Sequence, residues 1–86
     1  MKLGEPSIDQ LRIFLAVVEE GSFGRAAKRM GRAISAVSYG IAQMETQLGV
    51  ELFKREGSRR PELTDAGRGL LAEARAVADR ADALLA

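Results

Sequence analysis

The pattern of apolar and polar residues is most regular in residues 35–48, SAVSYGIAQMETQL. Apolar residues recur there at steps of four, three and four, and at ~100° per residue they form one narrow stripe of a helix: Val37, Ile41, Met44 and Leu48. The opposite side, which we call the uncharged arc, contains Ser35, Ser38, Tyr39, Ala42, Gln43 and Thr46. Glu45 is the only charged residue of the stretch. Such an arc indicates a surface that contacts another molecule, and small polar residues on an ordinary exposed helix are the alternative.

Two shorter helices are predicted before this stretch. Ser7 and Gln10 have the spacing of a capping box at the start of the first helix, and Gly21 tolerates the positive φ that often follows a helix end. The apolar stripe of this helix is Ile8, Leu11, Leu15 and Val18, widened by Phe14 and Val17. The second helix covers residues 23–30, between the cap Ser22 and Gly31. Its inward residues are Ala26, Ala27 and Met30, and its outward residues are Arg25, Lys28 and Arg29.

Only a few residues, including Gly31, separate the second helix from the helix of residues 35–48. The two helices must therefore meet at a steep angle, which is the geometry of a helix-turn-helix. After Gly49, residues 50–55 lean towards β structure with Leu52 and Phe53 inward, 56–60 are turn-like, and 61–63 form a second short strand. We expect a small basic hairpin here, and a surface loop is the alternative.

A long helix is predicted from Asp65 to the end of the chain, capped by Thr64. Its apolar residues recur at four, three, four and three, as in a short coiled coil: Leu70, Ala74, Val77, Ala81 and Leu84, which we call the heptad stripe. About 22 residues span ~33 Å, which is longer than so small a core can cover. The stripe therefore favours pairing with a second copy over packing on its own domain.

The composition favours one small domain and a poor catalytic inventory. The chain has 86 residues, a net charge of +1, no cysteine and no histidine. It thus lacks thiolate chemistry and the commonest general base and metal ligand. No metal-ligand cluster, glycine-rich phosphate loop or internal repeat is evident, so we expect no enzyme activity and no cofactor. Apolar runs are short and the start lacks a signal-peptide pattern, so we expect a cytoplasmic protein that does not contact membranes.

Positive charge is concentrated on both sides of the uncharged arc. Residues 21–32 carry four basic residues and no acid, and residues 51–62 carry Lys54, Arg55, Arg59 and Arg60 against three Glu. A basic run is often only a solvated helix face. Two basic segments around an uncharged surface, however, are the layout expected where phosphates flank a surface that contacts base edges.

Three stretches together resemble the amino-terminal DNA-binding domain of the LysR-type transcriptional regulators: LRIFLAVVEEGSFGRAAKRM, SAVSYGIAQMETQLGVELFKR and LTDAG. With the intervening residues they cover nearly the whole chain. The resemblance implies a mainly α fold, a winged helix-turn-helix with three helices and a short two-stranded wing (residues 1–63), followed by a long C-terminal linker and dimerisation helix (residues 64–86). It also implies an effector-binding domain that this sequence does not contain, and hence a longer protein.

Carried over by position, the base-reading residues are Ile34, Ser35, Ser38 and Tyr39. The candidate phosphate and wing residues are Ser22, Arg25, Arg32, Gln43, Lys54, Arg55, Arg59 and Arg60. Family members commonly have Ser-Gln-Pro where this chain has Ala33-Ile34-Ser35, and Arg where it has Tyr39, so a polar cap, a Gln and an Arg are missing. Ser35 is the candidate replacement cap. Gly40 costs up to ~1 kcal/mol relative to Ala in a helix, which predicts a close approach of backbone or DNA.

We therefore predict a sequence-specific DNA-binding domain of a bacterial-type regulator, nucleoid-associated when it is bound. The recognition helix would enter the major groove and the wing would contact phosphate or the minor groove. The expected partners are double-stranded DNA and a second copy paired through the last helix, with a tetramer as an option for a full-length protein. A small-molecule effector would act only through the absent domain. The rival interpretation is a winged helix that docks a protein through its uncharged arc.

Overall fold

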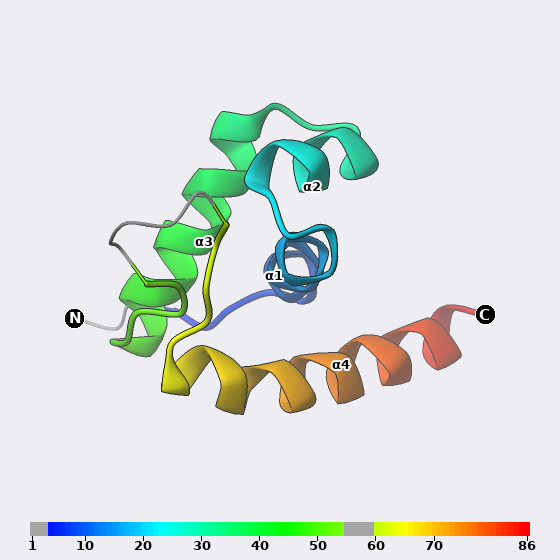
Figure 1. Ribbon diagram of the computed structural model, residues 1–86. Helices are drawn as coiled ribbons and strands as arrows, with labels where there is room; N and C mark the ends of the chain where they lie inside the picture. The colour runs from blue at the N-terminus through cyan, green and yellow to red at the C-terminus, as the bar shows by residue number, and fades with distance from the viewer. Residues whose placement is uncertain (1–3, 55–59) are drawn as a thin grey trace.

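The computed structural model describes residues 4–54 and 60–86. Within them lie four helices: α1 (Ile8–Glu20), α2 (Phe23–Met30), α3 (Ile34–Leu48) and α4 (Asp65–Leu85). Helix α1 is central and packs against the other three, α2 also packs against α3, and α4 extends beside α1 (Figure 1). The predicted mainly α architecture is confirmed.

Short-range signals fix most of the helix ends. The Ser7 hydroxyl accepts a hydrogen bond from the Gln10 amide at 3.0 Å, and the Gln10 side chain accepts one from the Ser7 amide at 2.7 Å, which confirms the capping box. The Thr64 hydroxyl accepts from the Gly67 amide at 3.0 Å and caps α4. The first three helices each end at a glycine with positive φ: Gly21, Gly31 and Gly49.

The start of α3 differs from the prediction. The helix begins at Ile34, and its N-cap is Ala33, which provides no side-chain hydrogen bond. Ser35 therefore lies inside the first turn, and its predicted role as the cap is wrong. The turn closes through backbone bonds alone, from the amides of Ala36 and Val37 to the Ala33 carbonyl at 3.0 and 3.3 Å.

The core is centred on the middle of α1, where five consecutive residues, 13–17, are buried. Because α1 has helices on several sides, burial there extends beyond one stripe. Phe53 extends the core beyond the helices, since its ring lies 5.6 Å from that of Phe14 and 5.7 Å from that of Phe23. Two predicted core positions, Ile8 and Leu48, are instead exposed, because each lies at the end of its helix.

Two glycines mark places where elements approach closely. A Cβ at Gly40 would lie 3.0 Å from Ile13 Cδ1, so the close neighbour of Gly40 is a side chain of α1 and not the backbone that the sequence suggested. A Cβ at Gly67 would lie only 2.2 Å from the Leu52 carbonyl oxygen. The first turn of α4 can therefore lie against the chain before it only because residue 67 has no side chain.

The predicted two-stranded hairpin is one isolated antiparallel bridge, Phe53–Leu63, in the described residues. It is flanked by backbone hydrogen bonds from Lys54 N to Glu62 O at 2.7 Å and from Thr64 N to Leu52 O at 3.0 Å. Phe53 and Leu52 point inward as predicted. The predicted wing residues Arg55 and Arg59 lie outside the described residues.

The heptad stripe of α4 is divided between the core and the surface. Ala74 and Ala81, with Ala78, are buried within the chain, whereas Val77 and Leu84 are exposed. Among the described helices α4 packs against α1 alone. The expectation that the whole stripe is available to a second copy is corrected, because the small residues of α4 allow it to pack closely on α1.

Candidate nucleic-acid interface

The uncharged arc is exposed along α3. All six of its residues are on the surface, and Tyr39 has 67% of its area exposed. The predicted base-reading residues Ile34, Ser35, Ser38 and Tyr39 all lie in the first two turns, at the same end of the helix. The structure therefore brings this predicted set together on one accessible surface.

The one carboxylate of α3 is turned away from that surface. Glu45 Oε2 accepts hydrogen bonds from the backbone amides of Leu52, at 2.7 Å, and Phe53, at 3.4 Å. Its charge thus holds the segment after α3 against the helix. Gln43 is also engaged, because its Oε1 accepts a hydrogen bond from Gln10 Nε2 at 3.3 Å. The arc consequently presents no charged side chain, and its hydrogen-bonding groups at the start of α3 are hydroxyls.

The amino-terminal ends of α2 and α3 lie close together. A Cβ at Gly24 would lie 3.7 Å from Ile34 Cδ1 and equally far from the hydroxyl of Ser22. Ser22 is the cap of α2, and its hydroxyl accepts from the Arg25 amide at 3.1 Å. Two predicted phosphate-contacting residues, Ser22 and Arg25, therefore lie beside the predicted base-reading end of α3.

The basic segment of residues 21–32 is largely paired with acids of α1. Arg29 lies 2.9 Å from Glu19 and 3.2 Å from Glu20, and Arg25 lies 3.9 Å from Glu20. The segment carries no acid in the sequence, but the packing of α2 on α1 supplies the acids. Lys28 makes no ion pair within the described part of the chain.

Arg32 is held most tightly of these residues. Its guanidinium forms a bidentate ion pair with Asp9: Nη1 donates to Oδ2 at 2.7 Å and Nη2 to Oδ1 at 2.6 Å. The hydrogen bonds from Arg32, followed by its charge, lower the pKa of Asp9. Sequence reasoning did not find Asp9, because nothing in a sequence signals a contact between residues 23 positions apart.

Lys54 and Arg60, the two predicted wing residues that the structure describes, are also engaged. Lys54 Nζ lies 3.7 Å from Glu62 on the other side of the bridge. The guanidinium of Arg60 lies against Gly21, where a Cβ would be 2.9 Å from its Nη2. This places Arg60 at the carboxyl end of α1, where a helix presents unpaired carbonyls and partial negative charge.

A shallow apolar groove runs along the exposed side of α4. Its lining residues are Ile8, Ala76, Val77, Arg80, Ala81 and Leu84. Three of them are large apolar side chains with substantial exposure: Ile8 46%, Val77 41% and Leu84 83%. The exposed part of the heptad stripe thus continues onto the start of α1.

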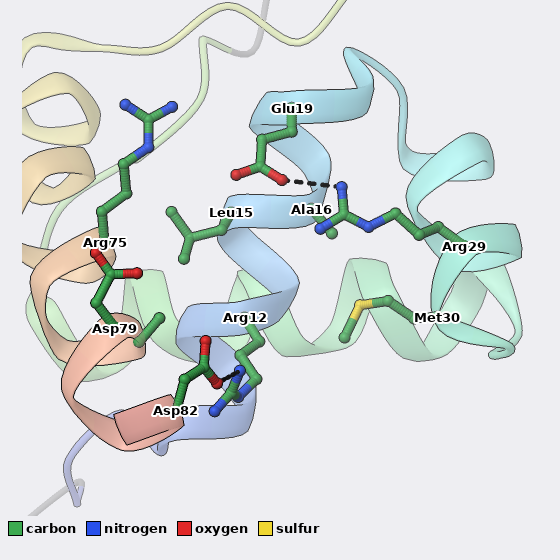
Figure 2. Close-up of a pocket in the computed structure, with 10 residues that line it drawn as sticks. Arg12, Leu15, Ala16, Glu19, Arg29, Met30, Arg75, Asp79 and Asp82 are labelled. Atoms are coloured by element: carbon green, nitrogen blue, oxygen red, sulfur yellow. Dashed lines mark hydrogen bonds and ion pairs between the residues drawn. The ribbon is translucent and has the colours of Figure 1, made fainter. Parts of the chain in front are cut away.

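A charged cavity of about 380 Å³ lies between α1, α2 and α4 (Figure 2). On one side Arg29 of α2 pairs with Glu19 of α1, and on the other Arg12 of α1 pairs with Asp82 of α4 at 2.9 Å. These pairs link α2 and α4 to α1. Exposed pairs contribute up to ~1 kcal/mol each, so the cavity is consistent with a structural role.

The described residues contain no group of three or more acidic, His or Cys residues that could bind a metal. In the same part of the chain, every helix is too short or too polar to cross a membrane.

Comparison with protein families matches residues 8–68 to "Bacterial regulatory helix-turn-helix protein, lysR family". The match covers α1, α2, α3 and the first turn of α4. The chain belongs to the LysR family. It is a helix-turn-helix DNA-binding domain of that family of transcriptional regulators.

Several LysR-family relatives are similar over most of the chain. A probable hydrogen peroxide-inducible genes activator of Mycobacterium xenopi is 44% identical over 82 residues, which are 95% of this chain and 43% of the relative. The probable regulator YhaJ of Escherichia coli is 40% identical over 78 residues, 91% of this chain and 26% of the relative. The chain therefore spans less than half the length of these LysR-family regulators.

Solved LysR-family structures have the same fold. An OxyR mutant from Corynebacterium glutamicum superposes with a TM-score of 0.90 at 34% identity, over 96% of this chain and 26% of that one. BenM_DBD in complex with benA site 1 DNA gives 0.86 at 34% identity, over 92% and 91%. CbnR_DBD in complex with DNA gives 0.82 at 36% identity, over 88% and 86%. Two of these similar domains are thus bound to DNA.

Proposed function

We propose that this chain binds specific double-stranded DNA sequences with the start of α3 in the major groove. The observation that carries the proposal is the uncharged arc, which is exposed, carries no charge and lies beside Ser22 and Arg25 at the start of α2. A protein surface without charge contributes little to attraction for phosphate, but its hydroxyls can donate to and accept from base edges. Residues Ile34, Ser35, Ser38 and Tyr39 would contact bases.

Phosphate contacts would position this helix. Arg25 is the leading candidate on α2, because its pair with Glu20 is long, at 3.9 Å, and its side chain is 74% exposed. Ser22 lies beside the base-reading end, near Ile34, and Gln43 follows that end along the exposed side of α3. On the wing, Lys54 and Arg60 would act together with Arg55 and Arg59, with the pairing at Phe53–Leu63 as the base of a two-stranded wing. Phosphate contacts fix register without reading sequence.

We further propose that residues 1–63 form the DNA-binding unit and residues 64–86 the dimerisation helix of a homodimer. The groove at Ile8, Val77 and Leu84 supports this assignment, because it is apolar and lies on the side of α4 that α1 leaves uncovered. A homodimer places two recognition helices on one duplex, which is the usual way such domains recognise paired half-sites. Leu70, half-buried, would lie at the edge of the contact.

Fluorescence anisotropy against two duplexes tests the DNA-binding proposal. One duplex is selected by the protein from a random pool, and the other has the same composition in scrambled order. We expect tighter binding to the selected duplex, and log K falling with log salt at a slope of about −0.9 per phosphate neutralised. A flat salt dependence, with equal weak binding to both duplexes, would overturn the proposal and favour docking of a protein on the uncharged arc.

A further inference from the structure

The start of α3 exposes a large aliphatic side chain. Ile34 is the first residue of the helix and 55% of its area is exposed. Its Cδ1 lies beside Gly24 at the start of α2, 3.7 Å from where a Cβ of residue 24 would be. The exposed area of Ile34 lies at the end of the helix that is proposed to contact DNA. Removing that apolar area from water is favourable, and a bound partner would do so.

The other groups near Ile34 limit what this end of α3 can distinguish. Its neighbours on the surface are the hydroxyls of Ser35 and Ser38, which both donate and accept and so discriminate weakly. Gln43, the one amide of the uncharged arc, already bonds Gln10. No side chain at the start of α3 thus offers the two-pronged hydrogen bonding that distinguishes guanine or adenine in the major groove.

Base pairs also differ in the major groove by one apolar group, the C5 methyl of thymine. We propose that Ile34 is a specificity residue that recognises a thymine by packing on this methyl group. The inference rests on the proposed function, since it requires the start of α3 to lie in the major groove. The contact is apolar, so it would add sequence preference without changing the number of phosphates neutralised.

Replacing thymine with deoxyuridine tests the contact, because uracil lacks only the C5 methyl and keeps the same hydrogen-bonding edge. Each thymine of the selected duplex is replaced singly, and affinity is measured by anisotropy at fixed salt. We expect one position per half-site where the change weakens binding about fourfold, which is the loss of affinity expected when one methyl group is no longer buried. At that position Ile34→Ala should bind the thymine and uracil duplexes equally, with an unchanged salt slope.

Val50→Ala is the matched control, because Val50 is also an exposed β-branched residue but lies after α3. It should keep the full uracil effect. Unchanged circular dichroism and melting temperature would show that Ile34→Ala is folded.

Different outcomes separate a failure of the methyl contact from a failure of the proposed DNA binding on which it depends. If the natural chain prefers the selected duplex with a steep salt slope, yet no uracil position matters, the methyl contact is wrong and DNA recognition stands. An uracil effect that persists in Ile34→Ala assigns the methyl contact to another residue and overturns the role of Ile34. If the chain does not prefer the selected duplex at all, the proposed function itself fails.

Discussion

Helix α3 buries three large residues in its middle, Val37, Ile41 and Met44, and the surface opposite them is mostly small and polar. Helix α4 fully buries only glycine and alanine and exposes Val77 and Leu84. Both helices pack on α1. The large aliphatic residues in the middle of α3 are used inside the domain, and Ile34 and Leu48 are exposed only at its two ends. The surface between the ends is therefore mostly polar and suited to a hydrated, hydrogen-bonding partner. The small residues of α4 bring it close to α1, so Val77 and Leu84 remain exposed and could contact an apolar partner such as the proposed second copy.

The difference shows that the size of the buried residues, as well as their spacing, determines what a helix offers outside. A stripe of large residues fills the core by itself. A stripe of alternating small and large residues, such as the heptad stripe, can be divided, because the small members fit against a neighbouring helix and the large members turn outward. Four substitutions test this comparison, in order of expected effect.

Gly67→Ala tests how closely α4 approaches the chain before it. The new Cβ would meet the backbone oxygen of Leu52 at 2.2 Å, and backbone cannot rotate away as a side chain can. We expect a loss of at least about 2 kcal/mol in the free energy of unfolding, measured by urea denaturation. Gly69→Ala is the control, because nothing lies within 4 Å of its Cβ, and it should stabilise by up to ~1 kcal/mol. Equal effects of the two substitutions would show that α4 is not held against Leu52.

Val77→Asp tests the exposed side of α4. A carboxylate at this position would be buried and unpaired in the proposed dimer, which costs several kcal/mol and should produce a monomer. Ala72→Asp is the control, since Ala72 is exposed on α4 but does not line the groove. Sedimentation velocity measures the oligomeric state of both variants, and only Val77→Asp should be a monomer. A natural chain that is monomeric at high micromolar concentration would remove the proposed use of the groove.

Gly40→Ala is the counterpart of Gly67→Ala on α3. The atom that its Cβ would approach, at 3.0 Å, is the end of the Ile13 side chain, which can shift by a few tenths of an ångström. The helix preference for Ala, up to ~1 kcal/mol, opposes this strain, so the net change should lie within about 1 kcal/mol of zero. A loss in urea denaturation as large as that of Gly67→Ala would show that α3 is as rigidly packed as the start of α4.

Asp9→Asn removes the carboxylate that pairs with Arg32, just before α3, and should change DNA affinity only slightly. Once the Asp9 carboxylate is removed, Arg32 can contact phosphate instead. Affinity for all DNA sequences should therefore rise roughly two- to fivefold, which corresponds to the free energy of one exposed ion pair. The salt slope should steepen by about one unit. Glu5→Gln removes the same charge nearby without touching that pair and serves as the control in the same anisotropy titrations. Weaker binding by Asp9→Asn would mean that Asp9 holds Arg32 in place for phosphate.

Local signals in the sequence sufficed for most of the helix ends. The pairing of Ser7 with Gln10, the capping by Thr64 and the glycine at the end of α2 act over a few residues, and the structure confirms each. The exposure of Tyr39 also followed from helical periodicity alone.

What the sequence did not predict depends on contacts between distant residues. The pairing of Asp9 with Arg32, the turning of Glu45 towards Leu52 and the fit of Gly67 against the same residue all need the helices in place. The start of α3 was misplaced for a different reason, because Ala33 caps the helix with its backbone alone and leaves no side-chain signal. The base-reading and phosphate-contacting roles stay predictions.

Selection of DNA by Tyr39→Arg tests most directly whether the uncharged arc meets base edges. Arginine at this exposed position can form bidentate hydrogen bonds with guanine, which contribute ~1–3 kcal/mol of discrimination against the other bases. We predict a new preference for guanine at one position per half-site. Ala72→Arg, which adds the same charge on α4, should not produce it. A uniform rise in affinity with a steeper salt slope would place residue 39 on phosphate. If neither affinity nor preference changes, α3 does not lie in the major groove and does not read the DNA sequence.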